Sequence, residues 1–278
     1  METLEVGDGR VLEYVVAGPA GGTPLVLHHG TPGVGIVLEP LAQAAAKYGL
    51  RFVSHSRPGY RTSTPRTGRI VADVAGDVSL LLDAIDADEF VTIGWSGGGP
   101  HALACAALLP QRCRSAAIIA GVAPYNADGL DWMAGMGADN VAEFGAAATG
   151  VEALDGFLAE AGAGLKDLQP ADVIAAFGDL LSAVDQQALR DGLAGYLAEA
   201  CRAAVSHGYD GWRDDDFAFI ADWGVDLASI RVPVSIWQGD QDRMVPHDHG
   251  RWLGAHVAGA TTHLVPGEGH LSLMKNID

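Results

Sequence analysis

The sequence predicts an α/β fold, in which a mostly parallel β-sheet is flanked by helices and interrupted by an inserted block of helices. Short, continuous apolar runs recur along the chain, as is typical of parallel strands that are buried on both faces. Segments with helical periodicity separate these runs, and such alternation favours a parallel sheet. The alternation stops after residue 123 and resumes at about residue 225. The chain therefore divides into a sheet-containing core and an insertion.

The expected elements begin with a hairpin at one edge of the sheet. Leu4–Val6 and Val11–Val16 flank the turn signal Gly7-Asp8-Gly9, and we expect them to form antiparallel strands. Buried strands are then expected at 25–28, 51–55, 90–95, 116–120, 234–237 and 262–265. The clearest helix is expected over 71–85, where apolar residues recur at spacings of three and four and form one face.

The segment from 124 to 224 lacks convincing strands and is rich in Ala and Gly with helical patterns. A helical block of this size between two sheet strands is typical of an inserted cap. We therefore predict an α/β core formed by residues 1–123 and 225–278 and a helical cap at 124–224. Within the cap, the acidic cluster Asp214-Asp215-Asp216 is interpreted as a helix start in preference to a cation site.

The composition restricts the compartment and the partners. The 278 residues carry 17 Lys and Arg against 35 Asp and Glu, a net charge of −18, which disfavours nucleic acid and anionic membrane surfaces. No window approaches the ~18 uncharged apolar residues of a membrane span. The acidic N-terminus lacks the apolar segment of a signal peptide, and the three cysteines lack metal-ligand or redox spacing. We expect a cytoplasmic protein with no metal.

The motif with the strongest chemical meaning is Gly94-Trp95-Ser96-Gly97-Gly98, which lies between an apolar strand and a helix-forming stretch. A sharp strand-to-helix turn forces the serine into a strained conformation and leaves room only for glycine two residues to either side. The serine hydroxyl is then raised above the sheet edge, within reach of a base. A phosphate-binding turn is the alternative, but the lysine and following Ser or Thr of such a loop are missing. We predict that Ser96 is a nucleophile.

A serine hydroxyl needs a neighbouring base, which an acid must orient. The loops after the last two strands supply candidates in Gly239–Asp242 and Gly269-His270. Because the carboxyl ends of parallel strands meet in one crevice, these loops should converge on the serine. His270 is the expected base and Asp242 the expected acid. Asp240 is the alternative acid, although it follows its strand directly and suits a turn that bonds backbone N–H groups.

Backbone N–H groups must stabilise the negative charge that develops on an attacked carbonyl oxygen. Gly97, directly after the serine, is one expected donor. The second donor should come from the loop at 28–33, where Pro32 has no N–H, which leaves Thr31.

Three further residues near these loops are candidate substrate contacts: His29, His55 and Trp95. His247 and His249 have no third ligand nearby that would favour a metal site, and a helix that starts after Pro246 accounts for them.

Together these features resemble the α/β-hydrolase superfamily, in its serine-nucleophile branch with a helical cap. The resemblance covers nearly the whole chain and rests on motifs in a fixed order: the His29-Gly30 loop, Ser56–Ser63, the serine elbow, Gly239–Asp242 with Val245-Pro246, and Gly269-His270. The serine separates the chain from relatives with an elbow aspartate, such as epoxide hydrolases and haloalkane dehalogenases. The loop at 29–33 resembles that of proline iminopeptidases, although here the tryptophan of the elbow precedes the serine. Eight residues follow His270, so we expect the closing helix of the superfamily to be short or missing.

The resemblance implies a serine hydrolase without a cofactor that cleaves an ester, thioester or lactone of a small, largely apolar molecule through an acyl-enzyme. Some relatives on the same scaffold are ligand-sensing receptors, lyases or cofactor-free oxygenases, and these are the alternatives. An aminopeptidase of the proline iminopeptidase type is another. The oligomeric state is not predicted.

Overall fold

An eight-stranded β-sheet organises the computed structural model, which describes residues 1–7 and 9–276. In the described part of the chain the strand order is β1-β2-β4-β3-β5-β6-β7-β8. The strands are β1 (Glu2–Glu5), β2 (Val11–Ala17), β3 (Thr23–His28), β4 (Leu50–His55), β5 (Phe90–Trp95), β6 (Cys113–Ile119), β7 (Val234–Gly239) and β8 (Thr261–Val265). Every run that the sequence predicts as a strand is found in the sheet.

The hairpin occupies the edge of the sheet, as expected. Strand β1 pairs antiparallel with β2, and β2 pairs antiparallel with β4. All remaining pairs, from β4–β3 to β7–β8, are parallel. Asp8 in the hairpin turn lies outside the described residues.

Helices cover both faces of the sheet, because successive strand residues point to opposite sides. Leu25 and Leu27 of β3 pack in one cluster with α1 (Glu39–Lys47). Val26, between them, packs in the other cluster with α2 (Val74–Ala84) and α3 (Gly99–Leu108). The helix predicted over 71–85 is thus α2, preceded by a 3-10 turn. A further helix, α10 (His247–His256), begins directly after Pro246, as expected.

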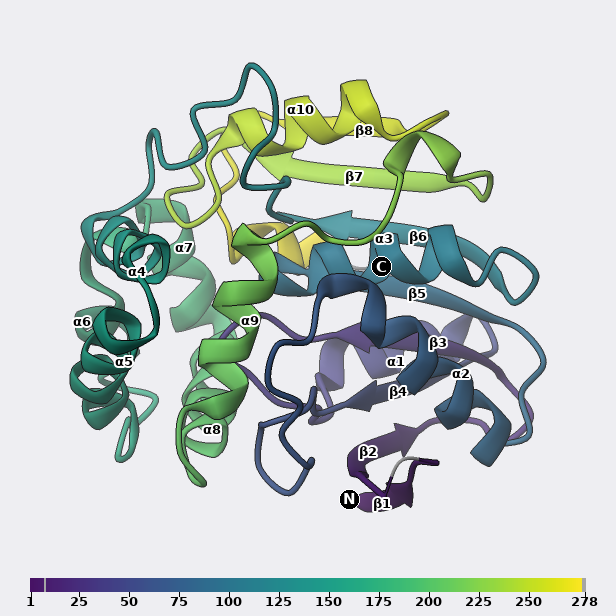
Figure 1. The fold of residues 1–278 in the computed structure, drawn as a ribbon. Helices are drawn as coiled ribbons and strands as arrows, with labels where there is room; N and C mark the ends of the chain where they lie inside the picture. The colour runs from purple at the N-terminus through teal and green to yellow at the C-terminus, as the bar shows by residue number, and fades with distance from the viewer. Residues whose placement is uncertain (8, 277–278) are drawn as a thin grey trace.

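The segment between β6 and β7 is helical. Residues 124–224, all of which the structure describes, contain no strand. Their helices are α4 (Ala138–Thr149), α5 (Val151–Leu165), α6 (Val173–Phe177), α7 (Ala183–Ala188), α8 (Ala194–Ala204) and α9 (Asp210–Ile220). Figure 1 shows α4 to α7 gathered beyond one end of the sheet, with α8 and α9 between them and the core. We call residues 124–224 the helical insertion. No helix in the described residues has the length and apolar character needed to cross a membrane.

The three aspartates at 214–216 do not start a helix, contrary to expectation. Helix α9 begins one turn earlier, with Asp210 in its first turn, and the three side chains are buried in its middle. The pattern of acidic residues was misleading because Asp215, in the middle of the helix, binds the buried guanidinium groups of Arg57 and Arg69 and does not cap the helix N-terminus.

Asp215 joins the insertion to the core through a buried ionic network. Its Oδ2 lies 2.6 Å from Nη2 of Arg57, and its Oδ1 lies 2.5 Å from Nη2 of Arg69. The hydroxyl of Tyr60 also donates to Oδ2 at 2.9 Å. Burial raises the pKa of Asp215, but Arg57 and Arg69 hold it well below its ordinary value. The carboxylate therefore remains ionised between two guanidinium groups of the core.

Replacing this carboxylate should destabilise the protein. We expect Asp215→Asn to cost roughly 3–5 kcal/mol, because two buried guanidinium groups lose their counter-ion. For a chain of this size, this corresponds to a fall in Tm of about 10 °C, measurable by thermal unfolding.

Asp210→Asn is the matched control on the same helix. Asp210 pairs with Arg213 at a partly exposed position, so its loss should cost roughly 0.5 kcal/mol or less. If Asp215→Asn and Asp210→Asn had the same Tm, the Asp215 network would not be what anchors the helical insertion to the core.

Candidate active site

Ser96 occupies a strained turn between β5 and α3. Its φ of 55° lies in the left-handed region, which non-glycine residues rarely adopt. A Cβ on Gly94 would lie 2.3 Å from the carbonyl oxygen of Gly98, and one on Gly98 would lie 2.0 Å from that of His28. Both positions therefore require glycine, as the sequence predicts. The side chain of Ser96 is half-buried and lines a pocket.

His270 and Asp242 form a buried hydrogen-bonded pair beside this turn. Nδ1 of His270 lies 2.8 Å from Oδ2 of Asp242, and because a carboxylate oxygen accepts hydrogen bonds, Nδ1 is assigned as the donor. The other oxygen of Asp242 accepts the backbone N–H groups of Met244 at 2.9 Å and Val245 at 2.8 Å. These bonds hold the carboxylate so that it faces Nδ1 of His270 and leaves Nε2 for chemistry.

Gln238, near the end of β7, gives the acid a further hydrogen bond. Its side-chain amide donates to Oδ2 of Asp242 at 2.9 Å and to the carbonyl of Val245 at 2.7 Å. The side chain is fully buried. Gln238 is not among the residues predicted from the sequence, although a polar amide at the end of an apolar strand is a signal that could have identified it.

Asp240, the alternative acid, lies on the surface. Its Oδ1 accepts the backbone N–H of Gly267 at 2.8 Å and the side-chain amide of Gln241 at 3.0 Å. This is the turn role that the sequence favours for it. Asp242 is the carboxylate that contacts His270.

The environment of His270 favours its protonated form. Burial lowers its pKa, but the charge and hydrogen bond of Asp242 raise it further than burial lowers it, and Asp185 adds to this. The net pKa is raised. The indole of Trp95 stacks on the imidazole with ring centroids 6.2 Å apart, so His270 lies directly beside the serine turn.

Thr31 and Gly97, the two predicted backbone donors, lie against each other. A Cβ on Gly97 would lie 2.6 Å from Oγ1 of Thr31, and both residues line the same pocket as Ser96. Nη2 of Arg57 donates to the carbonyl of Gly30 at 3.1 Å. Because C=O and N–H point in opposite directions across a trans peptide, the Thr31 N–H points away from Arg57.

The loop before Thr31 is fixed by the same ionic network that anchors the insertion. Nη1 of Arg57 donates to the carbonyl of His29 at 2.6 Å. The hydroxyl of Thr31 donates to Oδ2 of Asp215 at 2.7 Å. The sequence identified the Arg57 loop only as part of the resemblance and gave neither Arg57 nor Asp215 a role.

His29, His55 and Trp95 do not line this pocket, so the geometry does not support them as substrate contacts. His29 is buried, and its Nε2 accepts the backbone N–H of Arg57 at 3.2 Å. His55, the last residue of β4, is buried, and burial lowers its pKa to about 4. Trp95 is buried between His270 and Tyr196. The sequence indicates proximity to a loop but not the direction in which a side chain points, and the role of these three residues stays a prediction.

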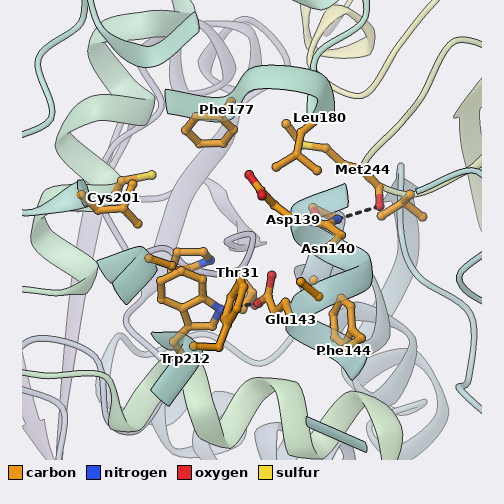
Figure 2. A pocket seen from close by; sticks show the side chains of 18 of the residues that line it. Thr31, Asp139, Asn140, Glu143, Phe144, Phe177, Leu180, Cys201, Trp212 and Met244 are labelled. Carbon is orange, nitrogen blue, oxygen red and sulfur yellow. Dashed lines mark hydrogen bonds between the residues drawn. The ribbon is translucent and has the colours of Figure 1, made fainter. Parts of the chain in front are cut away.

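A pocket of about 530 Å³ opens between Ser96 and the helical insertion. Its lining from the core includes Ser96, Gly97 and Thr31. The insertion supplies most of the wall, and Figure 2 shows its side chains around the cavity. The apolar part of this wall includes Phe144, Phe157, Leu165, Phe177, Leu180 and Trp212.

Glu143 places an ionisable group in this wall. Its Oε1 accepts the indole N–H of Trp212 at 2.5 Å, and Figure 2 shows both side chains at the cavity. Burial raises the pKa of Glu143 to about 7, against hydrogen bonds from Trp212 and Asp216 that lower it. The neighbouring Asp216 has a pKa raised well above its ordinary value by burial and by Glu143. Below about pH 7 this part of the wall is therefore neutral.

Comparisons with known proteins agree with this architecture. A non-heme chloroperoxidase from Streptomyces lividans is 34% identical over 138 residues, which are 47% of this chain and 50% of that protein. The alignment thus spans about half the length of that relative. The structure of an alpha/beta hydrolase fold protein from Nakamurella multipartita is 26% identical, with a TM-score of 0.65 and coverage of 98% of this chain and 92% of that one. The enol-lactonase from Burkholderia xenovorans LB400 is 21% identical and has a TM-score of 0.68, with coverage of 99% and 94%.

The family model described as alpha/beta hydrolase fold matches residues 23–277, which is most of the chain. The sheet order, with its antiparallel edge and parallel centre, agrees with that match. The chain therefore belongs to the alpha/beta hydrolase fold family.

Proposed function

We propose that this protein is a serine hydrolase that cleaves an ester, thioester or lactone of a small, largely apolar substrate. The observation that carries the proposal is the buried His270–Asp242 pair, 2.8 Å between Nδ1 and Oδ2, beside the strained turn at Ser96. The oriented base and the strained serine support nucleophilic acyl transfer, in which a base activates a hydroxyl and an acid orients the base.

The proposed reaction proceeds through an acyl-enzyme. Oγ of Ser96 attacks the substrate carbonyl while Nε2 of His270 takes the hydroxyl proton. Asp242 stabilises the imidazolium, and the N–H groups of Gly97 and Thr31 stabilise the oxyanion. The imidazolium then gives its proton to the departing oxygen or sulfur, and the acyl group remains on the serine. A water molecule, deprotonated by His270, releases the acid and restores the hydroxyl.

The pocket suggests the class of substrate. We propose that the helical insertion acts as the cap, because most of the wall beside Ser96 comes from it. Within the described residues that line the pocket, the ionisable side chains include three carboxyls, Asp139, Glu143 and Glu160, and no lysine, arginine or histidine. Such a wall repels anions, so the preferred acyl group is uncharged and apolar.

A binding protein on the same scaffold is the alternative that an experiment must separate. Reaction with a fluorophosphonate probe, together with many turnovers on p-nitrophenyl esters, supports the hydrolase. Labelling with a single turnover, or a ligand-induced rise in Tm without product, supports a receptor. A chlorination assay run beside the ester panel tests the activity named for the Streptomyces relative.

Ser96→Ala should abolish activity without unfolding the protein. Removal of a triad nucleophile lowers turnover by roughly 10⁶-fold. We expect no fluorophosphonate labelling and a Tm close to that of the wild type, because only one hydroxyl is lost. Wild-type esterase activity in the purified variant would exclude the proposed mechanism.

The two acids after β7 should differ sharply in their effects. Asp242→Asn favours the wrong tautomer of His270, and loss of this orientation lowers turnover by roughly 10⁴-fold. Asp240→Asn removes an exposed turn contact and should lower Tm slightly while turnover stays near the wild-type value. Steady-state rates and melting curves of both variants test this. The assignment is reversed if Asp240→Asn is the inactive protein.

The charge of Glu143 should make selectivity depend on pH. Because its pKa is raised to about 7, the carboxyl ionises between pH 6 and pH 8. Over this interval, KM for p-nitrophenyl hemisuccinate should rise about fivefold relative to KM for p-nitrophenyl butyrate, for one repulsion of about 1 kcal/mol. Glu143→Gln should remove this rise. An equal pH response in wild type and variant would show that Glu143 does not face the acyl group.

A further inference from the structure

Asp185, on α7 of the insertion, contacts the backbone that carries His270. Its Oδ2 accepts the N–H of His270 at 3.2 Å. Its Oδ1 accepts the N–H groups of Leu271 at 2.7 Å and Ser272 at 3.0 Å. The side chain is fully buried, although it comes from a segment 85 residues earlier in the chain. One carboxylate thus binds three consecutive peptide groups, beginning with that of the expected base.

Neighbouring residues complete this contact. The hydroxyl of Ser182 donates to Oδ2 of Asp185 at 2.7 Å. A Cβ on Gly269 would lie 2.3 Å from Oδ2 and 2.5 Å from Oδ1 of Asp185, so only glycine permits this approach. The glycine of the Gly269-His270 motif therefore has a physical reason in this protein, namely access for the carboxylate.

The contact suits a carboxylate and no other group of this size. An ionised carboxylate offers two oxygens with about four acceptor sites, whereas an amide offers one oxygen and two donors. With asparagine at 185, an oxygen facing Leu271 and Ser272 would leave an NH₂ group facing the N–H of His270. The lost bond would then be the one at the histidine.

We propose that Asp185 is a positioning residue for His270, through which the helical insertion sets the orientation of the catalytic base. This inference rests on the proposed function, in which His270 transfers protons. The backbone N–H of His270 binds Asp185, its carbonyl oxygen faces the indole N–H of Trp95 at 3.4 Å, and its Nδ1 binds Asp242. These three contacts come from the insertion, from the serine turn and from the β7–α10 loop, and together they fix the ring.

The same contact has an electrostatic consequence. Among the described residues, the charged groups that act on His270 are Asp242 and Asp185, and both raise its pKa against the effect of burial. Two other titratable groups lie nearby. Glu268, two residues earlier on the same loop, is half-buried. Tyr196 stacks on Trp95, and burial raises the pKa of its phenol, which therefore stays neutral. Removal of the Asp185 charge should therefore lower the pKa of His270.

Asp185→Asn tests the proposal through kcat and the pH profile. We expect kcat to fall by about 10²-fold, as for a misplaced catalytic group, with a smaller change in KM. The acid limb of kcat/KM should move to lower pH, because neutral imidazole is the active form and its pKa is lowered. Partial unfolding would reduce the active fraction without moving this limb.

Two further variants keep the test specific. Asp191→Asn breaks an exposed bond of 2.8 Å between the insertion and Lys275, in the short 3-10 helix Ser272–Asn276, and should change neither kcat nor the acid limb. Gly269→Ala keeps the Asp185 charge but pushes the carboxylate off the loop, and should lower kcat. The proposal is overturned if Asp185→Asn has wild-type kcat and an unshifted limb, or if Asp191→Asn reproduces its effects.

A direct titration separates this inference from the hydrolase proposal. In protein with isotope-labelled histidine, NMR follows the His270 ring in wild type and in Asp185→Asn, with no substrate present. A lower His270 pKa in the variant supports the contact between Asp185 and His270 even if Ser96→Ala shows that the hydrolase mechanism is wrong. An unchanged His270 pKa, together with Ser96-dependent turnover, rejects the positioning role alone.

Discussion

The buried carboxylate of Asp215 is the contact on which both the helical insertion and the loop facing Ser96 depend. Burying a carboxylate with two guanidinium groups costs several kcal/mol per ion, and this cost is offset only with good geometry and additional hydrogen bonds to the ions. Arg57 meets this condition by also donating to the carbonyls of His29 and Gly30. The need to satisfy a buried ion pair thus determines the conformation of the loop that presents Thr31. Stability and site geometry here have the same physical origin.

Asp185 has a parallel role on the other side of the serine. Asp215 fixes the loop after β3, and Asp185 fixes the loop after β8 that carries His270. Both carboxylates come from the insertion, whereas the loops that they bind come from the core. The insertion is therefore more than a wall for the pocket, because the two sides of the proposed active site are each held by one of its acids. A displacement of the insertion would alter the oxyanion loop and the base together.

The sequence predicts those parts of the protein that depend on local patterns. Apolar runs and turn signals located the strands, and the Gly94–Gly98 motif located the strained serine. His270 and Asp242 were identifiable because they follow strand ends, and parallel strands bring such ends together. Asp215 and Asp185 were not identifiable, since their partners lie 158 and 85 residues away in the sequence. Buried charge pairs of this kind leave no periodic signal, and Asp214-Asp215-Asp216 consequently suggested a helix terminus.

These three aspartates show why residue type alone does not specify a chemical role. Consecutive residues of a helix point about 100° apart, so each carboxyl faces a different environment. Asp215 faces Arg57 and Arg69, which keep it ionised. Burial raises the pKa of Asp214 to about 6, and burial with the neighbouring Glu143 raises that of Asp216 well above its ordinary value. Within two residues, α9 thus presents a permanent charge to the core and a protonated acid behind the pocket wall. The direction of each side chain, set by how α9 packs, decides which acid anchors the fold and which adjusts the polarity of the pocket.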